Sequence, residues 1–217
     1  MRHMTPIDKC LGVADNALRT LFGGYQVTNR KNPSQDVEET EDDKSQFDSQ
    51  QKRHSAGLMR INHCGEVCAQ ALYQGQALTA KLPEVREKME QAAAEENDHL
   101  QWCADRLKDL DSRTSILNPI WYAGSFSIGA VAGLLGDKWS LGFVAETEYQ
   151  VVRHLQSHLD QLPTNDKKSK AVIEQMKEDE LHHATAAIEA GGAELPVPVK
   201  LAMRGIAKLM TKSVYWV

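Results

Sequence analysis

Two Glu-x-x-His motifs are the residues of this sequence best suited to chemistry. The stretch AAAEENDHLQWC contains Glu96 and His99, and the stretch KEDELHHATAA contains Glu180 and His183. Residues three apart share one face of an α-helix, so each pair can point into a core. A buried carboxylate needs a proton, a base, a hydrogen-bond network or a metal ion. One motif decides little, because an exposed ion pair has the same spacing, and the recurrence is therefore the informative observation.

Helical periodicity places both motifs on apolar stripes. The first motif shares its stripe with Leu100, whereas Glu95 projects further round the helix. The second motif shares its stripe with Ile173 and Met176. The same projection puts three neighbours of the second motif on the solvent side: Glu178, Asp179 and His182.

Two further helices each offer one inward carboxylate. In RINHCGEVCAQALYQGQ, Glu66 is in line with Tyr73 and with small apolar residues. In FVAETEYQVVRHLQSHL, Glu148 falls on the stripe of Val144, whereas Glu146 falls on the polar side of the helix. Periodicity therefore favours Glu148 over Glu146 as the inward residue.

Four inward glutamates and two histidines form the ligand set of the ferritin-like di-iron and di-manganese carboxylate bundles. Four carboxylates neutralise most of the charge of two divalent ions, and two imidazoles leave coordination positions open for oxygen. Without a cation, carboxylates gathered in one core would repel each other, which disfavours the alternative of buried ion pairs. The sequence thus predicts a di-metal site with six ligands: Glu66, Glu96, His99, Glu148, Glu180 and His183.

The elements that must position these residues are helices. Long stretches rich in Ala, Leu, Glu, Lys and Gln contain no convincing alternation of β-branched residues, so the predicted fold class is all-α. We expect four long helices over residues 58–80, 83–110, 140–161 and 166–190, paired as hairpin, crossover and hairpin. This is a ferritin-like four-helix bundle with a long crossover that carries an extra helix, plus terminal helices.

Composition divides the chain into two regions. Residues 1–54 comprise an amphipathic helix over 5–24, ended by Gly23 and Gly24, and a flexible arm over 27–54 with twelve charges. Residues 55–217 comprise the catalytic four-helix bundle and a basic amphipathic tail, in which Lys200, Arg204 and Lys208 recur every four residues. The tail could attach the protein to an acidic membrane surface.

The crossover over 114–136 carries no charge. It is rich in Gly and Ser and slightly short for a membrane span. Two interpretations remain open: an interfacial helix with Trp121 and Tyr122 at the level of the lipid headgroups, or a helix that caps the bundle.

Overall composition excludes several classes of protein. A chain of 217 residues, 41% hydrophobic and 25% charged, fits one domain with appendages, and its net charge of −5 argues against a nucleic-acid partner. Four cysteines without a Cys-x-x-Cys pair favour a reduced cytoplasmic setting, and the start MRHMTPIDKCLG lacks the apolar core of a signal peptide. No G-x-G-x-x-G follows a strand, so a reductant must dock on the bundle or act through another protein.

Three residues near Glu66 have two interpretations each. Cys64 and Cys68 are more simply small core residues than ligands. His63 could orient a metal ligand or be an ordinary polar residue.

The segments RINHCGE, EENDH, VAETEYQVVRHL and MKEDELHHATAA, in this order and with these separations, resemble the bacterial demethoxyubiquinone hydroxylases of ubiquinone biosynthesis. The resemblance covers about residues 55–190 and leaves the 27–54 arm unmatched. Carried over by motif, the family's iron ligands fall on the six residues that periodicity selects. The resemblance also implies a catalytic role near the metals for His154, and the doubled AETE keeps Glu146 as an alternative ligand to Glu148.

The resemblance implies a monooxygenase that places one atom of O2 on the ring of 2-polyprenyl-3-methyl-6-methoxy-1,4-benzoquinone, or its quinol, and sends the other to water. It implies two Fe ions, O2 as cosubstrate, and a reductant such as NADH or a quinol with no recognisable binding motif. The implied partners are the polyprenylated quinone, the membrane and accessory ubiquinone-biosynthesis proteins, and a homo-oligomer is compatible with this class. The implied place is the cytoplasmic face of the cell inner membrane, with peripheral attachment.

Other functions would use the same ligands. An iron-handling ferroxidase, a manganese catalase or a hydroxylase of a different substrate stays open, because the ligand set does not select the ring. A storage protein would need a cage-forming oligomer. A metal-stabilised membrane scaffold would need its open coordination positions blocked.

Overall fold

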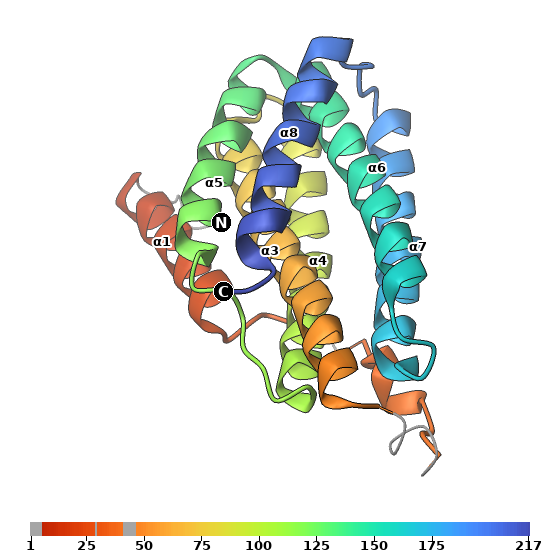
Figure 1. The fold of residues 1–217 in the computed structure, drawn as a ribbon. Coiled ribbons are helices and arrows are strands. Elements are labelled where there is room, and N and C mark those ends of the chain that lie inside the picture. The colour runs from red at the N-terminus through yellow and green to blue at the C-terminus, as the bar shows by residue number, and fades with distance from the viewer. Residues whose placement is uncertain (1–5, 29, 41–46) are drawn as a thin grey trace.

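The computed structural model describes residues 6–28, 30–40 and 47–217, and in these ranges it contains seven α-helices and no β-strand (Figure 1). The all-α prediction is confirmed. A short 3₁₀-helix, η1 (Pro33–Asp36), precedes the bundle. The seven helices are α1 (Pro6–Phe22), α3 (Ser49–Thr79), α4 (Pro83–Asp109), α5 (Asn118–Leu134), α6 (Asp137–Gln161), α7 (Lys167–Glu189) and α8 (Val197–Val214).

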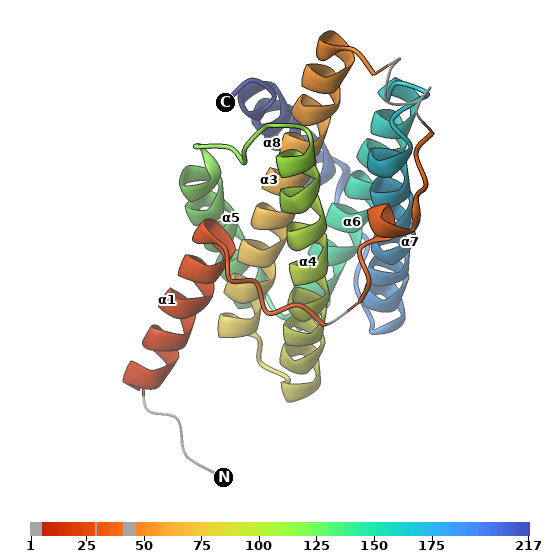
Figure 2. The ribbon, with the colours of Figure 1, turned by 90° about the horizontal axis from the view of Figure 1, so that it is seen from below.

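The four long helices form the bundle as two hairpins. The chain turns from α3 to α4 over residues 80–82 and from α6 to α7 over residues 162–166. Helix α4 packs against α7 and α3 packs against α6, while α5 is the crossover between the hairpins. Seen from below, α1 lies beside α5 at the edge of the molecule (Figure 2). The predicted arrangement of hairpin, crossover and hairpin is therefore correct.

Helix α3 begins earlier than predicted and runs through the expected domain boundary at residues 54 and 55. Asp48 forms a capping box: its side chain accepts from the backbone of Gln50 and Gln51, and the Gln51 side chain accepts from the backbone of Asp48. This cap satisfies two of the free N–H groups of the first turn, which favours a helix over the polar residues 49–54. The division into two domains stays a prediction.

The crossover helix α5 packs closely on α3. A Cβ atom at Gly75 or Gly129 would overlap the backbone of the other helix, so these glycines permit the close approach. The opposite face of α5 is exposed, with Ile120 69% and Leu134 65% accessible. One face of α5 is thus packed on the bundle, with Tyr122 buried in that contact, and the other is apolar and uncovered. Contact of α5 with a lipid interface stays a prediction.

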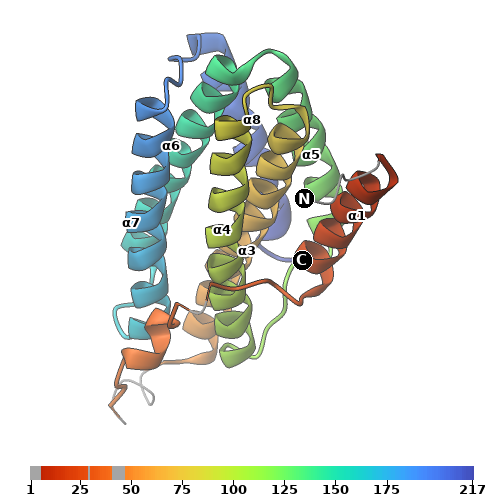
Figure 3. The same cartoon turned by 180° about the vertical axis from the view of Figure 1, so that it is seen from behind.

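The N-terminal strap, residues 25–28 and 30–40, differs from the predicted flexible arm. It crosses α4 and reaches α7 (Figure 3). Three side chains fix its described part: Thr28 donates to Asp98 of α4, Arg30 pairs with Asp179 of α7, and Glu39 pairs with Lys168. Composition alone predicted that the charged residues of this segment are solvated. Their partners lie on helices that are distant in the sequence, so composition could not reveal them. Residues 41–46 of the predicted arm lie outside the described residues.

The core consists of apolar clusters above and below a polar layer. One cluster contains Met59, Leu107 and Ile173, and a second contains Tyr73 and Val144. On each bundle helix, the inward glutamate lies in sequence between the residues of these two clusters. The apolar layers on both sides keep water from the glutamates and lower the local dielectric constant.

None of the helices in the described part of the chain is both long and apolar enough to cross a membrane.

Candidate metal centre

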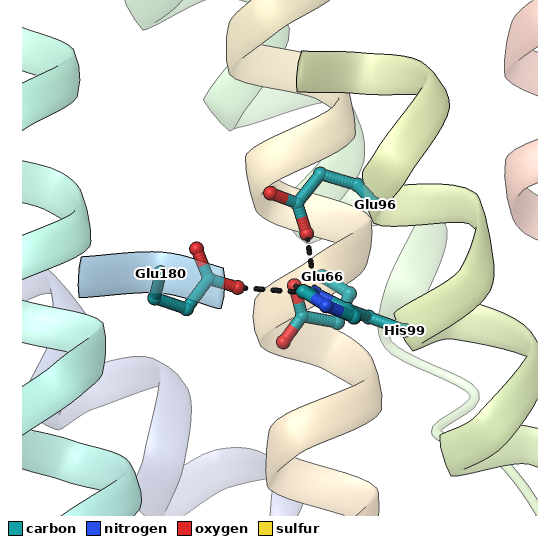
Figure 4. A group of neighbouring side chains, drawn as sticks. All are labelled: Glu66, Glu96, His99 and Glu180. Carbon is teal, nitrogen blue, oxygen red and sulfur yellow. Dashed lines mark hydrogen bonds and ion pairs between the residues drawn. The ribbon is translucent and has the colours of Figure 1, made fainter. Parts of the chain in front are cut away.

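Three glutamates and one histidine meet in the polar layer. Glu66 of α3, Glu96 and His99 of α4, and Glu180 of α7 each offer a ligand atom, and these atoms all lie within 4.8 Å of one another. All four side chains are buried, and they converge on one point between the helices (Figure 4). The inward direction that periodicity predicted for these residues is what brings them together.

Glu96 and Glu180 each contact both histidines. His99 Nδ1 lies 3.0 Å from Glu96 Oε2 and 3.1 Å from Glu180 Oε1. His183 Nδ1 lies 3.2 Å from Glu96 Oε1 and 3.3 Å from Glu180 Oε2. Each of these carboxylates therefore has one oxygen on the His99 side and one on the His183 side, as a carboxylate that bridges two metal ions requires.

Two outer carboxylates, which the sequence interpretation placed away from the site, hold the other nitrogen of each histidine. His99 Nε2–H donates to Asp179 Oδ2 at 2.9 Å, and His183 Nε2–H donates to Glu95 Oε2 at 2.7 Å. The bonds cross between helices, because Asp179 is on α7 and Glu95 on α4. Projection of one helix at a time misses such pairs. The available signal was the acidic residue directly before each inward glutamate, in Glu95-Glu96 and Asp179-Glu180.

These bonds decide which nitrogen of each histidine faces the centre. A carboxylate only accepts, so Nε2 carries a hydrogen toward the outer carboxylate, and Nδ1 is the nitrogen that faces the glutamate oxygens and would bind a metal ion held by them. Metal-binding histidines usually donate their second N–H to a carboxylate in this way.

The fourth inward carboxylate is Glu148 of α6, which is 1% exposed. Its Oε1 accepts a 2.5 Å hydrogen bond from the Tyr73 hydroxyl, and its buried Oε2 has no hydrogen-bond partner. Glu146 instead faces α8, where Arg153 lies 3.3 Å and Lys200 3.6 Å from its oxygens. The structure thus turns Glu148 into the polar layer and satisfies Glu146 with cations elsewhere.

The charges of the layer perturb one another strongly. Burial, followed by the charges of Glu96 and Glu180, raises the pKa of both Glu66 and Glu148 well above the usual value. Burial lowers the pKa of His99, but Glu96 and Asp179 outweigh it, so the pKa of His99 lies well above its usual value. Carboxylates held close together in a buried layer repel one another, so binding of a cation among them is favoured.

The donor set fits two divalent metal ions. Four carboxylates and two imidazole nitrogens match the preference of iron and manganese for oxygen and nitrogen ligands. The partnerless Glu148 Oε2 is a buried acceptor that a cation would satisfy. The structure thus places all six predicted residues in one layer, four of them in the tight cluster and Glu148 and His183 beside it.

An apolar groove of about 640 Å³ adjoins the site between α3, α5, α6 and α8. Glu66 and His154 lie in its wall, and most of the lining is apolar, including Ile61, Phe143 and Met203. His154 Nε2 is buried without a partner, and the His154 ring lies 4.0 Å from the His158 ring. His154 thus lines the groove and is not in the tight cluster.

The residues before Glu66 serve the fold. His63 is buried, with Nε2 3.0 Å from the Tyr25 hydroxyl and Nδ1 3.4 Å from Asn118 Nδ2. Burial lowers the pKa of His63 to about 4, so the ring is neutral near pH 7. Its bonds join the strap and α5 to α3, and none reaches a glutamate of the cluster. Cys64 is buried and Cys68 partly buried, and both are free thiols.

The fold and the site together define a class, the ferritin-like helical bundles with a buried carboxylate and histidine cluster. The bundle is similar to a dodecameric thioferritin, a bacterioferritin-related protein from Bacteroides fragilis, with a TM-score of 0.55 and 16% identity. That similarity covers 68% of this chain and 88% of the thioferritin chain, and it concerns the fold alone.

The chain belongs to the family described as ubiquinone biosynthesis protein COQ7, whose profile matches residues 53–214. It is 60% identical to the 3-demethoxyubiquinol 3-hydroxylase of Acinetobacter baylyi over 217 residues, with 100% of both chains covered. It is 58% identical to the enzyme of the same name from Pseudomonas fluorescens, covering 99% of this chain and 97% of that one. The Nitrosococcus oceani enzyme of that name is 52% identical, with 100% and 99% covered.

Proposed function

We propose that this protein is a 3-demethoxyubiquinol 3-hydroxylase that uses two iron ions and O2. The hydroxylase activity follows from the family and the full-length relatives. One observation carries the di-iron mechanism: the buried ligand set meets an apolar groove through Glu66. Storage or simple iron oxidation would not need such a groove beside the ligands.

The contacts support one division of ligands. Glu66 and His99 would hold one ion, Glu148 and His183 the other, and Glu96 and Glu180 would bridge the two. Glu66 Oε2 lies 4.0 Å from His99 Nδ1, and the charge of His183 acts to lower the pKa of Glu148 against the larger effect of burial. Glu146 serves instead as the anchor of α8.

The iron ions, when bound, would supply the reduction of O2 and the transfer of one oxygen atom to the ring. The chain's own residues bind and orient the ring: the apolar groove wall takes the prenyl tail and excludes water. The partnerless His154 Nε2 offers a hydrogen bond to a ring oxygen. His154 would therefore hold the ring in the groove beside Glu66.

The lipid substrate would reach the groove from a membrane. A polyprenyl tail leaves a bilayer only at a cost of about 0.8 kcal/mol per CH₂, so the protein should come to the lipid. Exposed apolar residues, among them Leu134, Leu201 and Leu209, lie on α5 and α8, two of the four helices that line the groove. Lys208 and Arg204 of α8 would draw this surface to anionic lipid on the cytoplasmic face.

The reductant would act without a dedicated nucleotide domain, because no strand and no phosphate-binding loop occur in the described part of the chain. NADH or a quinol could reduce the site directly or through accessory proteins of the pathway. A homo-oligomer would leave these proposals unchanged.

The activity can be tested with purified iron-loaded protein, a short-chain demethoxyubiquinol and ¹⁸O₂. We expect one ¹⁸O atom in the hydroxylated ring, and no product with Glu66→Ala. His154→Gln should raise KM or lower kcat without lowering the iron content. Iron oxidation at full rate with no ring product would instead support a ferroxidase, and activity restored by manganese with peroxide would support a catalase.

Membrane attachment can be tested separately with liposomes that contain anionic lipid. Leu134→Asp or Leu209→Asp should lower partitioning and slow a long-chain substrate more than a short-chain one. Ile188→Asp, on the exposed face of α7, is the matched control. Ile128 is a poorer probe because it lines the groove itself. Unchanged partitioning of both variants would refute this surface.

A further inference from the structure

The N-terminal strap reaches the candidate metal centre although it lies outside the residues that the family profile matches, 53–214. On α4, Thr28 N–H donates to Asp98 Oδ1 at 2.8 Å, and its hydroxyl donates to the other oxygen of the same carboxylate. On α7, Arg30 contacts Asp179, the outer carboxylate that holds His99. Only one residue, Asp179, therefore lies between the strap and the predicted ligand His99.

Two contacts connect Arg30 with His99. Arg30 Nη2 donates to both oxygens of Asp179, at 3.0 and 2.7 Å, and Asp179 Oδ2 accepts from His99 Nε2 at 2.9 Å. The guanidinium also lies 5.1 Å from the centre of the Trp102 ring, whose centre is 5.3 Å from that of His99. Arg30 thus touches two of the groups around the His99 ring, Asp179 and Trp102.

The other histidine has no such support from the strap. Glu95, the outer carboxylate of His183, is 30% exposed, and its second oxygen accepts from Gln91 at 3.3 Å. Asp179 is 15% exposed and accepts from Gln175 at 3.1 Å in the same way, but it also pairs with Arg30. The difference shows that Arg30 is a feature of one half of the site, and not a general property of this ligand motif.

We propose that Arg30 is a positioning residue of the metal centre, which fixes Asp179 so that His99 keeps its Nδ1 lone pair on the metal. The inference rests on the proposed di-metal site. A carboxylate held at both oxygens cannot rotate toward water, so its bond to His99 Nε2–H persists. That bond sets the tautomer and the ring angle of a ligand histidine, and outer partners of this kind change metal affinity about 10- to 100-fold.

The test is a titration of the metal-free, full-length protein with Co²⁺, whose visible absorption reports the ligand geometry. Arg30→Ala should weaken one of the two cobalt sites by about tenfold and change its spectrum. Arg30→Lys keeps the charge but not the planar guanidinium that lies over Trp102, and should recover only part of the affinity. Glu39→Gln, which removes the strap's ion pair with Lys168, is the matched control and should leave cobalt binding unchanged.

A double variant tests whether Arg30 acts on His99 through Asp179. If Arg30 acts through Asp179, then Arg30→Ala should add little to the loss caused by Asp179→Asn. Full additivity would overturn the proposal, as would wild-type cobalt affinity and spectrum in both Arg30 variants. Failure of the wild-type protein to bind two cobalt ions would instead overturn the di-metal site itself. Thermal melting of every metal-free variant separates a loss of folding from a loss of affinity.

Discussion

The two halves of the candidate metal centre have the same inner residues and different surroundings. Each half has a histidine that contacts both Glu96 and Glu180 and donates to an outer carboxylate. Around His99 the outer carboxylate is covered by Arg30 of the strap. Around His183 it adjoins a small pocket of about 150 Å³ between α4, α6 and α7. The repeated motif thus specifies the contacts among the inner residues. The surrounding chain decides whether each outer carboxylate is covered or adjoins a pocket.

The difference separates two routes of approach. The apolar groove reaches the His99 half through Glu66, and the small pocket contains His183 and Glu95. The groove has more than four times the volume of the small pocket, so the proposed ring substrate would enter by the groove. The half of the site that would meet the ring is therefore the half that the strap supports.

The largest effect should come from removing a residue that both halves share. Glu96→Ala and Glu180→Ala should each lose nearly all of the about two irons per chain expected for this ligand set, because both carboxylates contact both histidines. Glu66→Ala should retain about one, because Glu66 lies on the His99 side. Metal analysis of purified protein measures this. Unchanged iron in Glu96→Ala and Glu180→Ala would refute the ligand assignment.

The glutamates of α6 should show the next largest contrast. Glu148→Ala should abolish turnover, since it removes the fourth carboxylate of the layer. Glu146→Ala should keep most of it, because Glu146 pairs with Arg153 and Lys200 outside the layer. Hydroxylation of a short-chain substrate measures both. The opposite result would assign Glu146, and not Glu148, as the metal ligand of α6.

The outer carboxylates should show the asymmetry of the two halves directly. Asp179→Asn should weaken metal binding about 10- to 100-fold, because the neutral amide removes the charge that faces His99 and Arg30 and replaces one acceptor oxygen with an NH₂ donor. Glu95→Gln should cost less, since Glu95 is 30% exposed and water can replace its oxygen. Fe²⁺ titration of the two variants gives the comparison. Equal losses would show that the strap adds nothing.

The smallest effect should come from Tyr73, which contacts the His183 half only through Glu148. Tyr73→Phe should lower the free energy of unfolding of the metal-free protein by about 1 kcal/mol, because one buried hydrogen bond is lost, and should reduce turnover only severalfold. Tyr122→Phe is the control, since it removes a hydrogen bond to Gln74 away from the site. Urea unfolding and turnover, measured together, test this. Turnover reduced equally in both variants would assign Tyr73 to the fold alone.

The sequence by itself determined the helices and the inner face of each. Apolar residues at helical spacing, Pro83 and Pro119 near helix starts and glycines such as Gly23 after helix ends are local signals, and the structure follows them closely. The same spacing turned Glu148, and not Glu146, into the polar layer, whereas Glu146 is buried against α8. These properties could be predicted because they depend only on neighbours within a few residues.

The tertiary structure decided everything that joins one helix to another. The bond from Asp179 to His99 and that from Glu95 to His183 depend on α4 and α7 being neighbours at one height. The strap's charges looked solvated in the sequence because Arg30 meets its partner 149 residues away. Periodicity shows which face of a helix a residue occupies, but not which element packs against that face. Only the tertiary structure shows that.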